Sequence, residues 1–257
     1  MKVEILEKGE DWIKLKVSGI DYALANAIRR SSYEIYMPAI DELEVYTNDS
    51  VLYDEILANR LGLIPLVPKR EINAREECSC KGKGCSKCTL KIKIEEKGQR
   101  GGNMVYASAI KGEAEALFKE MPIVWLEEGQ ELKIVATVTL GKAIEHAKYQ
   151  AGLLVYNPVF ILKNFDKEIS SKEEIKSILE KFGIRLEKNS ELDEKQYEIL
   201  TYLQEKYNAK FDVEVSQTDF VFYVETFSYL KPIEIFVKAI DALKENLEKF
   251  LKEIKSK

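Results

Sequence analysis

Residues 21–40 read DYALANAIRRSSYEIYMPAI and residues 52–66 read LYDEILANRLGLIPL, and these two segments are the most informative of the chain. In the first segment, Asp21 is suited to cap a helix, and apolar or small residues follow at three- and four-residue spacing. This spacing predicts an amphipathic helix over residues 21–36. Its apolar face consists of Leu24, Ala27, Ile28, Ser31 and Ile35.

The opposite face of this predicted helix is basic and carries Asn26, Arg29 and Arg30. The guanidinium group is a rigid fork of donors, so adjacent arginines suit docking against carboxylates or backbone carbonyls of a partner. The alternative is a solvated face that contacts nothing, which is common for surface charge.

All four cysteines of the chain lie close together, as Cys78, Cys80, Cys85 and Cys88 in the pattern C-x-C-x4-C-x2-C. Disulfides do not persist in a reducing compartment, whereas four thiolates in a short loop can enclose a tetrahedral metal ion. We expect structural zinc, with iron and redox-active thiols as alternatives.

The residues between the cysteines suit this metal loop. Glycines at positions 82 and 84 permit a tight reversal of the backbone, and Lys81, Lys83 and Lys87 are close enough in sequence to offset the negative charge of a zinc tetrathiolate. A closed shell of four sulfurs leaves no open coordination position, so the expected role is structural and not catalytic.

Composition excludes several classes of protein. The 257 residues carry a formal net charge of -5 and no basic block, so contact with nucleic acid should be local or indirect. No segment reaches the length of an apolar membrane span, and the first residues alternate apolar and charged side chains, unlike a signal peptide. A cytoplasmic protein with no membrane contact is expected.

Periodicity along the chain predicts an α+β protein. Residues 2–20 are expected to form a hairpin, residues 39–47 a strand and residues 52–60 a short helix. Two runs of period two, residues 90–96 and 103–109, flank the turn-forming sequence KGQRGGN and are predicted to pair as a second hairpin. Further strands are expected at residues 121–126, 131–140, 211–217 and 219–227.

Residues 165–210 are expected to be helical. The first helix begins at a capping box, Ser171 to Glu174, and a second helix spans residues 193–209. The buried face of the first helix is predicted to consist of Ile175, Ile178, Leu179 and Phe182.

The last segment, from Pro232 onwards, predicts a long helix with proline in its first turn. Its apolar residues alternate three- and four-residue spacing, which is a heptad pattern typical of helices that pack along another helix. A small sheet cannot cover the full length of such a helix, so a partner chain is expected on this seam. The seam consists of Ile233, Phe236, Ile240, Leu243, Leu247, Phe250 and Ile254.

The chain contains one histidine, His146, in the sequence EHAK. A lone histidine without a nucleophile or a set of metal ligands nearby is more often a structural hydrogen-bonding residue than a catalytic base. No clustered aspartates suited to a catalytic magnesium ion are present either. No residue is therefore expected to be catalytic.

The motifs NAIRR, DEILANRLGLIPL, the cysteine loop and EHAK resemble those of the family of archaeal RNA polymerase D subunits. This family is the counterpart of the bacterial alpha subunit and the eukaryotic third-largest polymerase subunit. The resemblance implies a discontinuous alpha-like dimerisation domain, formed by residues 1–40, 141–164 and 211–257. It also implies an inserted, mainly β, zinc-bearing domain at 41–140 and a small helical insertion at 165–210.

The resemblance also implies partners and a role. Family members are non-catalytic assembly subunits of DNA-directed RNA polymerase, which form a heterodimer with a smaller alpha-like subunit, called L in archaea. With the small N and P subunits the heterodimer forms a platform for the large catalytic subunits, and it meets DNA or RNA only indirectly. Asn26, Arg29, Arg30 and Arg60 would contact a large subunit, and the seam of the last helix would face the L subunit.

Some archaeal relatives hold an iron-sulfur cluster at the position of residues 165–210. These clusters need thiolate ligands, and this segment contains no cysteine, so no cluster is expected there. Two other functions remain as alternatives: a free-standing zinc-loop regulator that binds nucleic acid, and a thiol-dependent enzyme.

Overall fold

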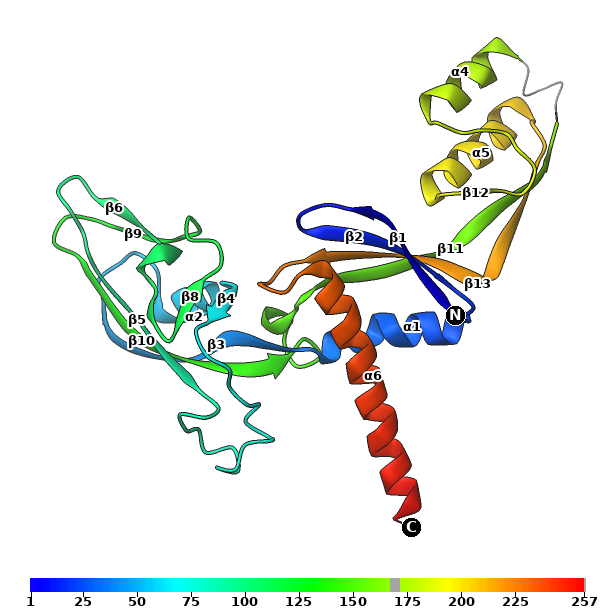
Figure 1. Cartoon of the computed structure of the whole chain (residues 1–257). Coiled ribbons are helices and arrows are strands. Elements are labelled where there is room, and N and C mark those ends of the chain that lie inside the picture. Colours follow the sequence, from blue (N-terminus) through cyan, green and yellow to red (C-terminus); the bar gives the residue numbers. More distant parts are fainter. Residues whose placement is uncertain (167–171, 257) are drawn as a thin grey trace. The chain divides into compact units, whose positions relative to one another are not determined.

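The computed structural model describes residues 1–166 and 172–256 of the chain (Figure 1). The chain forms two compact units, each made from separate segments of sequence. The first consists of residues 1–29 and 154–223, and the second of residues 30–153 and 224–257. The fold is mixed, with helices and sheets, as the periodicity predicted. The finer division into a dimerisation domain and two insertions stays a prediction.

A five-stranded sheet, in the order β1-β2-β13-β11-β12, organises the first unit. Strands β1 (Lys2–Lys8) and β2 (Trp12–Ser18) pair antiparallel, which confirms the first predicted hairpin. In β2 the apolar residues Ile13, Leu15 and Val17 are buried and alternate with half-exposed lysines. This alternation is typical of a sheet with one face on the core.

One strand, β13 (Phe211–Thr226), replaces the two strands expected at residues 211–217 and 219–227. In this strand, Ser216 is buried and donates a hydrogen bond to the carboxylate of Asp219 at 2.9 Å, while its own oxygen accepts from the backbone N–H of Asp219 at 3.1 Å. These local bonds satisfy the polar groups inside the strand.

Beside β13 lies β11 (Gly152–Phe165), which pairs with the short β12 (Ser190–Leu192). Helices α4 (Glu173–Lys181) and α5 (Glu194–Tyr207) flank β12 in the sequence. A shared apolar core holds these elements together. Its buried members are Phe160, Leu162, Ile175, Leu179, Ile184, Leu192, Leu200, Leu203, Ala209 and Phe211.

The two predicted helices of this segment are present, with one change in the buried face. Ile175 and Leu179 are buried as expected, but Phe182 is 44% exposed. Phe182 follows the last turn of α4, and Gly183 then turns the chain at a φ of +64°, so that Ile184 takes the buried place. Ser171 of the predicted capping box lies outside the described residues.

In the second unit, a four-stranded sheet has the order β3-β10-β5-β7. Its strands are β3 (Tyr36–Asn48), β10 (Glu131–Lys142), β5 (Leu90–Lys97) and β7 (Lys111–Gly112). The predicted strands at 39–47 and 131–140 lie within β3 and β10. Strand β10 is central and pairs antiparallel with both β3 and β5.

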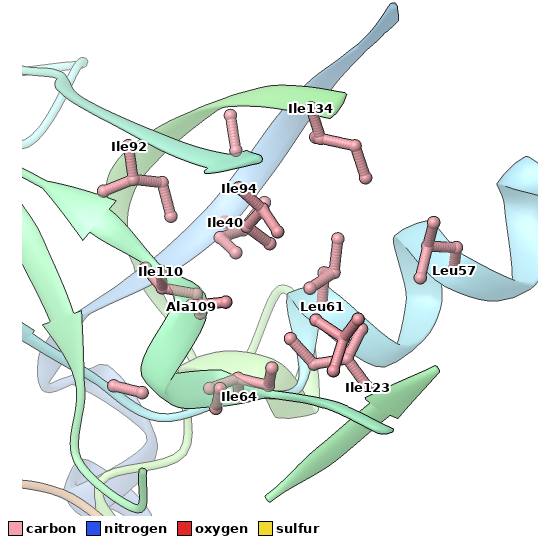
Figure 2. Packing of buried hydrophobic residues seen from close by; sticks show 14 of the residues in the cluster. Ile40, Leu57, Leu61, Ile64, Ile92, Ile94, Ala109, Ile110, Ile123 and Ile134 are labelled. Atoms are coloured by element: carbon pink, nitrogen blue, oxygen red, sulfur yellow. The ribbon is translucent and has the colours of Figure 1, made fainter. Parts of the chain in front are cut away.

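Helix α2 (Asp54–Gly62) corresponds to the helix predicted at residues 52–60 and covers this sheet. Leu57 and Leu61 of α2 are fully buried, and they share one apolar cluster with Ile40, Ile94 and Ile134 from the three long strands (Figure 2). Two small ribbons complete the unit. They pair β4 (Leu66–Pro68) with β8 (Ala114–Ala116), and β6 (Asn103–Tyr106) with β9 (Pro122–Leu126).

The predicted hairpin between residues 90–96 and 103–109 is wrong. Strand β5 pairs with β10 and β7, whereas β6 pairs with β9. Gly101 and Gly102, at φ values of +86° and +76°, turn the chain between β5 and β6. A Cβ on Gly102 would lie 2.6 Å from the ring of Trp125, so this turn is built against β9 and not against β5.

Two further helices remain, one near each end of the sequence. Helix α1 (Tyr22–Ser31) continues into the short 3-10 helix η1 (Ser32–Glu34), and α6 (Pro232–Lys255) packs on η1. Two other 3-10 turns are η2 (Ala107–Ala109) and η3 (Ala147–Tyr149). Pro232 opens α6, as predicted. Among the described residues, no helix combines the length and apolar character needed to cross a bilayer.

Candidate metal centre and interaction surfaces

The cysteines lie in the long connection between β4 and β5. Short backbone hydrogen bonds fold this loop on itself: the N–H of Asn73 donates to the carbonyl of Lys87 at 2.9 Å, and the N–H of Lys81 donates to that of Cys78 at 2.9 Å. Lys81, Gly82 and Gly84 have positive φ values of 53°, 79° and 82°. The reversal between the two cysteine pairs is therefore left-handed, which explains the two glycines.

The four sulfur atoms converge on one point. All lie within 4.8 Å of one another, and the Sγ–Sγ distances are 3.6 Å for Cys78 and Cys85 and 3.6 Å for Cys80 and Cys88. A tetrahedron with Zn–S bonds of about 2.3 Å has edges of about 3.8 Å, so the sulfurs fit a tetrahedral metal ion. The cysteines are not joined in disulfides. The group can hold a metal ion, and its geometry is compatible with zinc.

The thiols differ in acidity. Burial opposes ionisation of Cys80, but hydrogen bonds from the other thiols and from the N–H of Gly84 outweigh it and lower the pKa of Cys80 to about 6. Burial raises the pKa of Cys88 to about 12, because the N–H of Cys85 only partly compensates. The Cys80 thiolate therefore forms readily at neutral pH, whereas deprotonation of Cys88 needs a cation beside it.

Sequence reasoning missed one residue of this site, Arg75. Its Nη2 donates to Glu42 Oε1 of β3 at 2.9 Å, and its Nη1 lies 3.8 Å from Asp41 Oδ2. The hydrogen bond with Glu42 raises the pKa of Arg75 most, and burial opposes this, while the charges of Asp41 and Cys88 add to the rise. The signal in the sequence was an arginine three residues before the first cysteine. The lysines predicted to offset the thiolate charge, Lys81, Lys83 and Lys87, are exposed.

On α1, the predicted cap is confirmed, because Asp21 Oδ1 accepts a hydrogen bond from the N–H of Leu24 at 2.8 Å. Leu24 itself was predicted to be on the apolar face and is 39% exposed. The buried positions of α1 are Ala25, Ile28 and Ser31, so the buried stripe begins one residue later than expected.

The basic face of α1 is partly tied by its own side chains. Arg29 donates from Nε and Nη2 to Asn26 Oδ1 at 3.1 and 2.8 Å, and Arg30 is exposed. Arg60 projects from α2 and donates to the carbonyl of Pro122 at 2.9 Å, so it fastens α2 to β9. The contact of these four residues with a large subunit stays a prediction.

Helix α6 buries only its first part within the chain. The buried residues are Pro232, Ile235, Phe236 and Ala239. Of the predicted seam, Phe236 is buried and Leu243 half-buried. The five others are exposed, from 38% for Ile233 to 59% for Phe250. They are Ile233, Ile240, Leu247, Phe250 and Ile254.

The other side of α6 is polar. A groove of about 220 Å³ lies beside η1 and is lined on the helix by Lys238, Asp241 and Glu245. Sequence reasoning also missed Val237 and Leu251, which flank the seam and are 49% and 51% exposed.

His146 has the structural role expected of it. Its Nδ1 accepts a hydrogen bond from the N–H of Lys148 at 3.0 Å, and it precedes the 3-10 turn η3. Lys148 in turn donates from Nζ to the carbonyl of Ile40 at 3.1 Å and to Asp41 Oδ1 at 3.0 Å, which connects η3 to β3.

Comparison with known proteins shows the class of protein to which this chain is similar. Residues 39–160 match the family described as the RNA polymerase Rpb3/RpoA insert domain. The chain is 33% identical over 263 residues to the DNA-directed RNA polymerase subunit Rpo3 of Thermococcus kodakarensis, covering 99% of this chain and 98% of that protein. Rpo3 of Pyrococcus furiosus is 32% identical, covering 99% and 97%, and Rpo3 of Methanosphaera stadtmanae is 30% identical, covering 98% and 97%.

The chain belongs to the Rpo3 family of DNA-directed RNA polymerase subunits, which is the family of archaeal D subunits. The resemblance inferred from NAIRR, DEILANRLGLIPL, the cysteine loop and EHAK is confirmed.

Proposed function

We propose that this chain is a non-catalytic assembly subunit of DNA-directed RNA polymerase in transcription. The observation that carries this proposal is similarity over essentially the whole chain to subunits named Rpo3. A free-standing zinc-loop regulator is not supported by the comparisons, and the net charge of -5 does not favour binding along a phosphate backbone. A thiol-dependent enzyme would need a free thiolate, whereas all four thiols converge on one point.

The proposed partners are a smaller alpha-like subunit, the small N and P subunits, and the large catalytic subunits. The exposed apolar seam of α6 supports the first of these contacts, because contiguous apolar surface at this position is suited to a partner helix. The exposed Arg30 beside Arg29 supports a contact of α1 with a large subunit, braced by Arg60 and the GLIPL segment at residues 62–66.

The proposed cofactor is one structural zinc ion held by Cys78, Cys80, Cys85 and Cys88. Four sulfurs at tetrahedral spacing, with no position for an open ligand, support a structural ion and not a catalytic one. Zinc would displace the protons from the thiols and hold the loop closed.

The test of the assembly role is affinity purification of the tagged full chain from its native cells, with the co-purifying proteins identified. The expected result is recovery of the alpha-like subunit together with the large polymerase subunits. A tagged Glu245→Gln chain is a suitable control, since it changes the polar side of α6 only. A wild-type chain that is recovered as a stable monomer beside an unbound alpha-like subunit would refute the proposal.

A further inference from the structure

Arg75 lies between the cysteine loop and strand β3. One end of its guanidinium group is held by β3, through Glu42 Oε1 at 2.9 Å and Asp41 Oδ2 at 3.8 Å. Nη2 of Arg75, the atom that donates to Glu42, is 4.0 Å from the place that a Cβ on Gly84 would occupy. The guanidinium group therefore reaches the turn that separates the two cysteine pairs.

The third nitrogen of this guanidinium group is unsatisfied. In the part of the chain that the structure describes, Nε of Arg75 is the one buried side-chain nitrogen or oxygen without a hydrogen-bond partner. Leaving a buried charged donor unpaired is costly, so an unpaired buried donor in a folded protein points to a role beyond the contacts already made. The first cysteine follows Arg75 by three residues, and Nη2 of Arg75 reaches the turn at Gly84 between the two cysteine pairs, so the cysteine group lies close to this guanidinium group.

The complex of a divalent metal ion with four thiolates has a formal charge of -2. The thiolate sulfurs of this complex accept hydrogen bonds. Lys81, Lys83 and Lys87 are exposed, and their charge is screened by water. Arg75 is partly buried and is fixed in place by two carboxylates, so its charge acts at close range and without the entropy cost of ordering a free side chain.

We propose that Arg75 is a positioning residue of the metal centre. Its Nη atoms fasten the cysteine loop to β3, and its free Nε donor, with the guanidinium charge, stabilises the sulfurs in their deprotonated, metal-bound state. This inference rests on the metal site proposed above. It assigns to Arg75 the role that hydrogen-bonding partners of ligands have in other metal sites.

The same contacts connect the loop to η3. Asp41, which faces Arg75, also accepts from Lys148 Nζ at 3.0 Å and from the Tyr149 hydroxyl at 3.4 Å. Loading of the loop is therefore linked to the fixation of η3 on β3, because both use the same carboxylate.

Arg70 provides a matched control. It fastens the same loop, since its Nη2 donates to the carbonyl of Thr89 at 2.9 Å, but its Nε is already paired with Glu113 Oε1 at 2.9 Å. Loss of Arg70 removes an attachment of the loop but leaves the unpaired Nε of Arg75 in place.

The experiment measures the affinity of the full-length chain for Zn²⁺ by chelator competition, and for Co²⁺ by its visible absorption, in wild type, Arg75→Gln, Arg75→Lys and Arg70→Gln. We expect Arg75→Gln to weaken the metal affinity about 10- to 100-fold, the range found for other groups that support metal ligands. The metal affinity of Arg75→Lys should lie between those of Arg75→Gln and wild type, because lysine keeps the positive charge but lacks the several donors of the guanidinium group. Arg70→Gln should remain near wild type.

Equal affinity of wild type and Arg75→Gln would overturn the inference, and so would equal losses in Arg75→Gln and Arg70→Gln. Should Arg75→Gln not fold, as judged by circular dichroism, the comparison of Arg75→Lys with Arg70→Lys decides: a weaker site in the first supports the inference, and equal sites overturn it. A wild-type chain that binds no metal would instead contradict the proposed metal site, so the two failures are distinguishable.

Discussion

Two of the four thiols, those of Cys80 and Cys88, differ strongly in acidity. Burial raises the pKa of Cys88 to about 12; burial also opposes ionisation of Cys80, but hydrogen bonds from the other thiols outweigh it and lower the pKa of Cys80 to about 6. A metal ion must therefore displace the proton from Cys88 when it binds.

Replacement of one ligand, Cys85→Ser, is expected to lower the metal affinity and to loosen the loop. Serine places a neutral oxygen where the ion needs a thiolate, and metal binding is linked to local folding. Metal analysis after dialysis and limited proteolysis of residues 69–89 measure the two effects, with Ser86→Ala as the control. Retention of a full equivalent of tightly held zinc by Cys85→Ser would contradict the site, and iron with a visible absorption band in the wild type would contradict its assignment to zinc.

Glu113 binds both ends of this loop, through Arg70 and Lys91, and makes their attachment depend on pH. Its Oε2 accepts a hydrogen bond from the N–H of Lys91 at 2.7 Å, and its Oε1 accepts one from Arg70. The bond from Lys91 lowers the pKa of Glu113 most and the bond from Arg70 adds to this, while burial opposes both. A carboxyl group whose pKa is depressed in the folded state stabilises the fold above its unfolded pKa, and this contribution is lost as the pH falls through the folded value.

We therefore expect Glu113→Gln to be less stable than wild type near neutral pH and to converge with it in acid, below about pH 4 where the unfolded-state carboxyl is protonated. The side chain is 43% exposed, so screening keeps the difference below about 1 kcal/mol. Urea unfolding midpoints across this pH range measure it. A constant difference between the two proteins at every pH would show that the carboxylate charge is not involved.

Ligand residues and supporting residues differ in how far the sequence predicts them. The cysteines are close in sequence, so their spacing alone predicted the site. Arg75 is held in place by Glu42, which is 33 positions away, and no local pattern indicates that contact. Leu24 and Phe182 were assigned to buried faces and are exposed, because their place depends on the residue at which a helix begins or ends.

At the level of elements, the two arginines of α1 are held differently. Arg29 is bonded to Asn26, whereas Arg30 is exposed at the end of the helix. Replacing Arg29 also disturbs a contact within the helix, so the side chain of Arg30 is the better probe of a partner on this face.

Arg30→Glu, alone and with Arg29→Glu, is expected to leave the chain folded and to block recruitment of the large subunits. Surface substitutions usually change stability within about 0.5 kcal/mol, so the defect should be one of assembly. Reconstitution of the polymerase measures it, with reversal of the exposed Arg100 as the control. Normal reconstitution with the double variant would leave α1 with a solvated face.

The seam of α6 allows an equally specific test. Leu247→Lys places a charge in a strip that a partner helix would desolvate, and the variant should express but lose the alpha-like subunit. Glu245→Gln changes the charge by the same amount on the polar side of the helix and should retain the partner. Co-expression followed by size-exclusion chromatography distinguishes them, and retention of the partner by Leu247→Lys would exclude the seam from the interface.

Strands were predicted better than their pairing. The alternation in residues 90–96 and 103–106 indicated β5 and β6, but their partners β10 and β9 are fixed by contacts such as that of Gly102 with Trp125. A glycine-rich turn has the same local signal whether it joins two paired strands or leads the chain to another sheet.

On the scale of the whole molecule, sheet order is the feature that residue patterns predict least. Strand β2 pairs with β13, so residues near the two ends of the chain lie in one sheet. Hydrophobic alternation predicts that each strand has a buried face but not which strand covers its edge.

Helix α6 is exposed over most of its outer part. Beyond Ala239 no described residue of this helix is buried, and an isolated helix of such length is only marginally stable in water. In the free chain its last turns should fray, and their amide protons should exchange with solvent within the shortest labelling times. In the assembled enzyme the same amides should exchange slowly, so hydrogen exchange at the end of α6 would report, turn by turn, how far the partner extends along it.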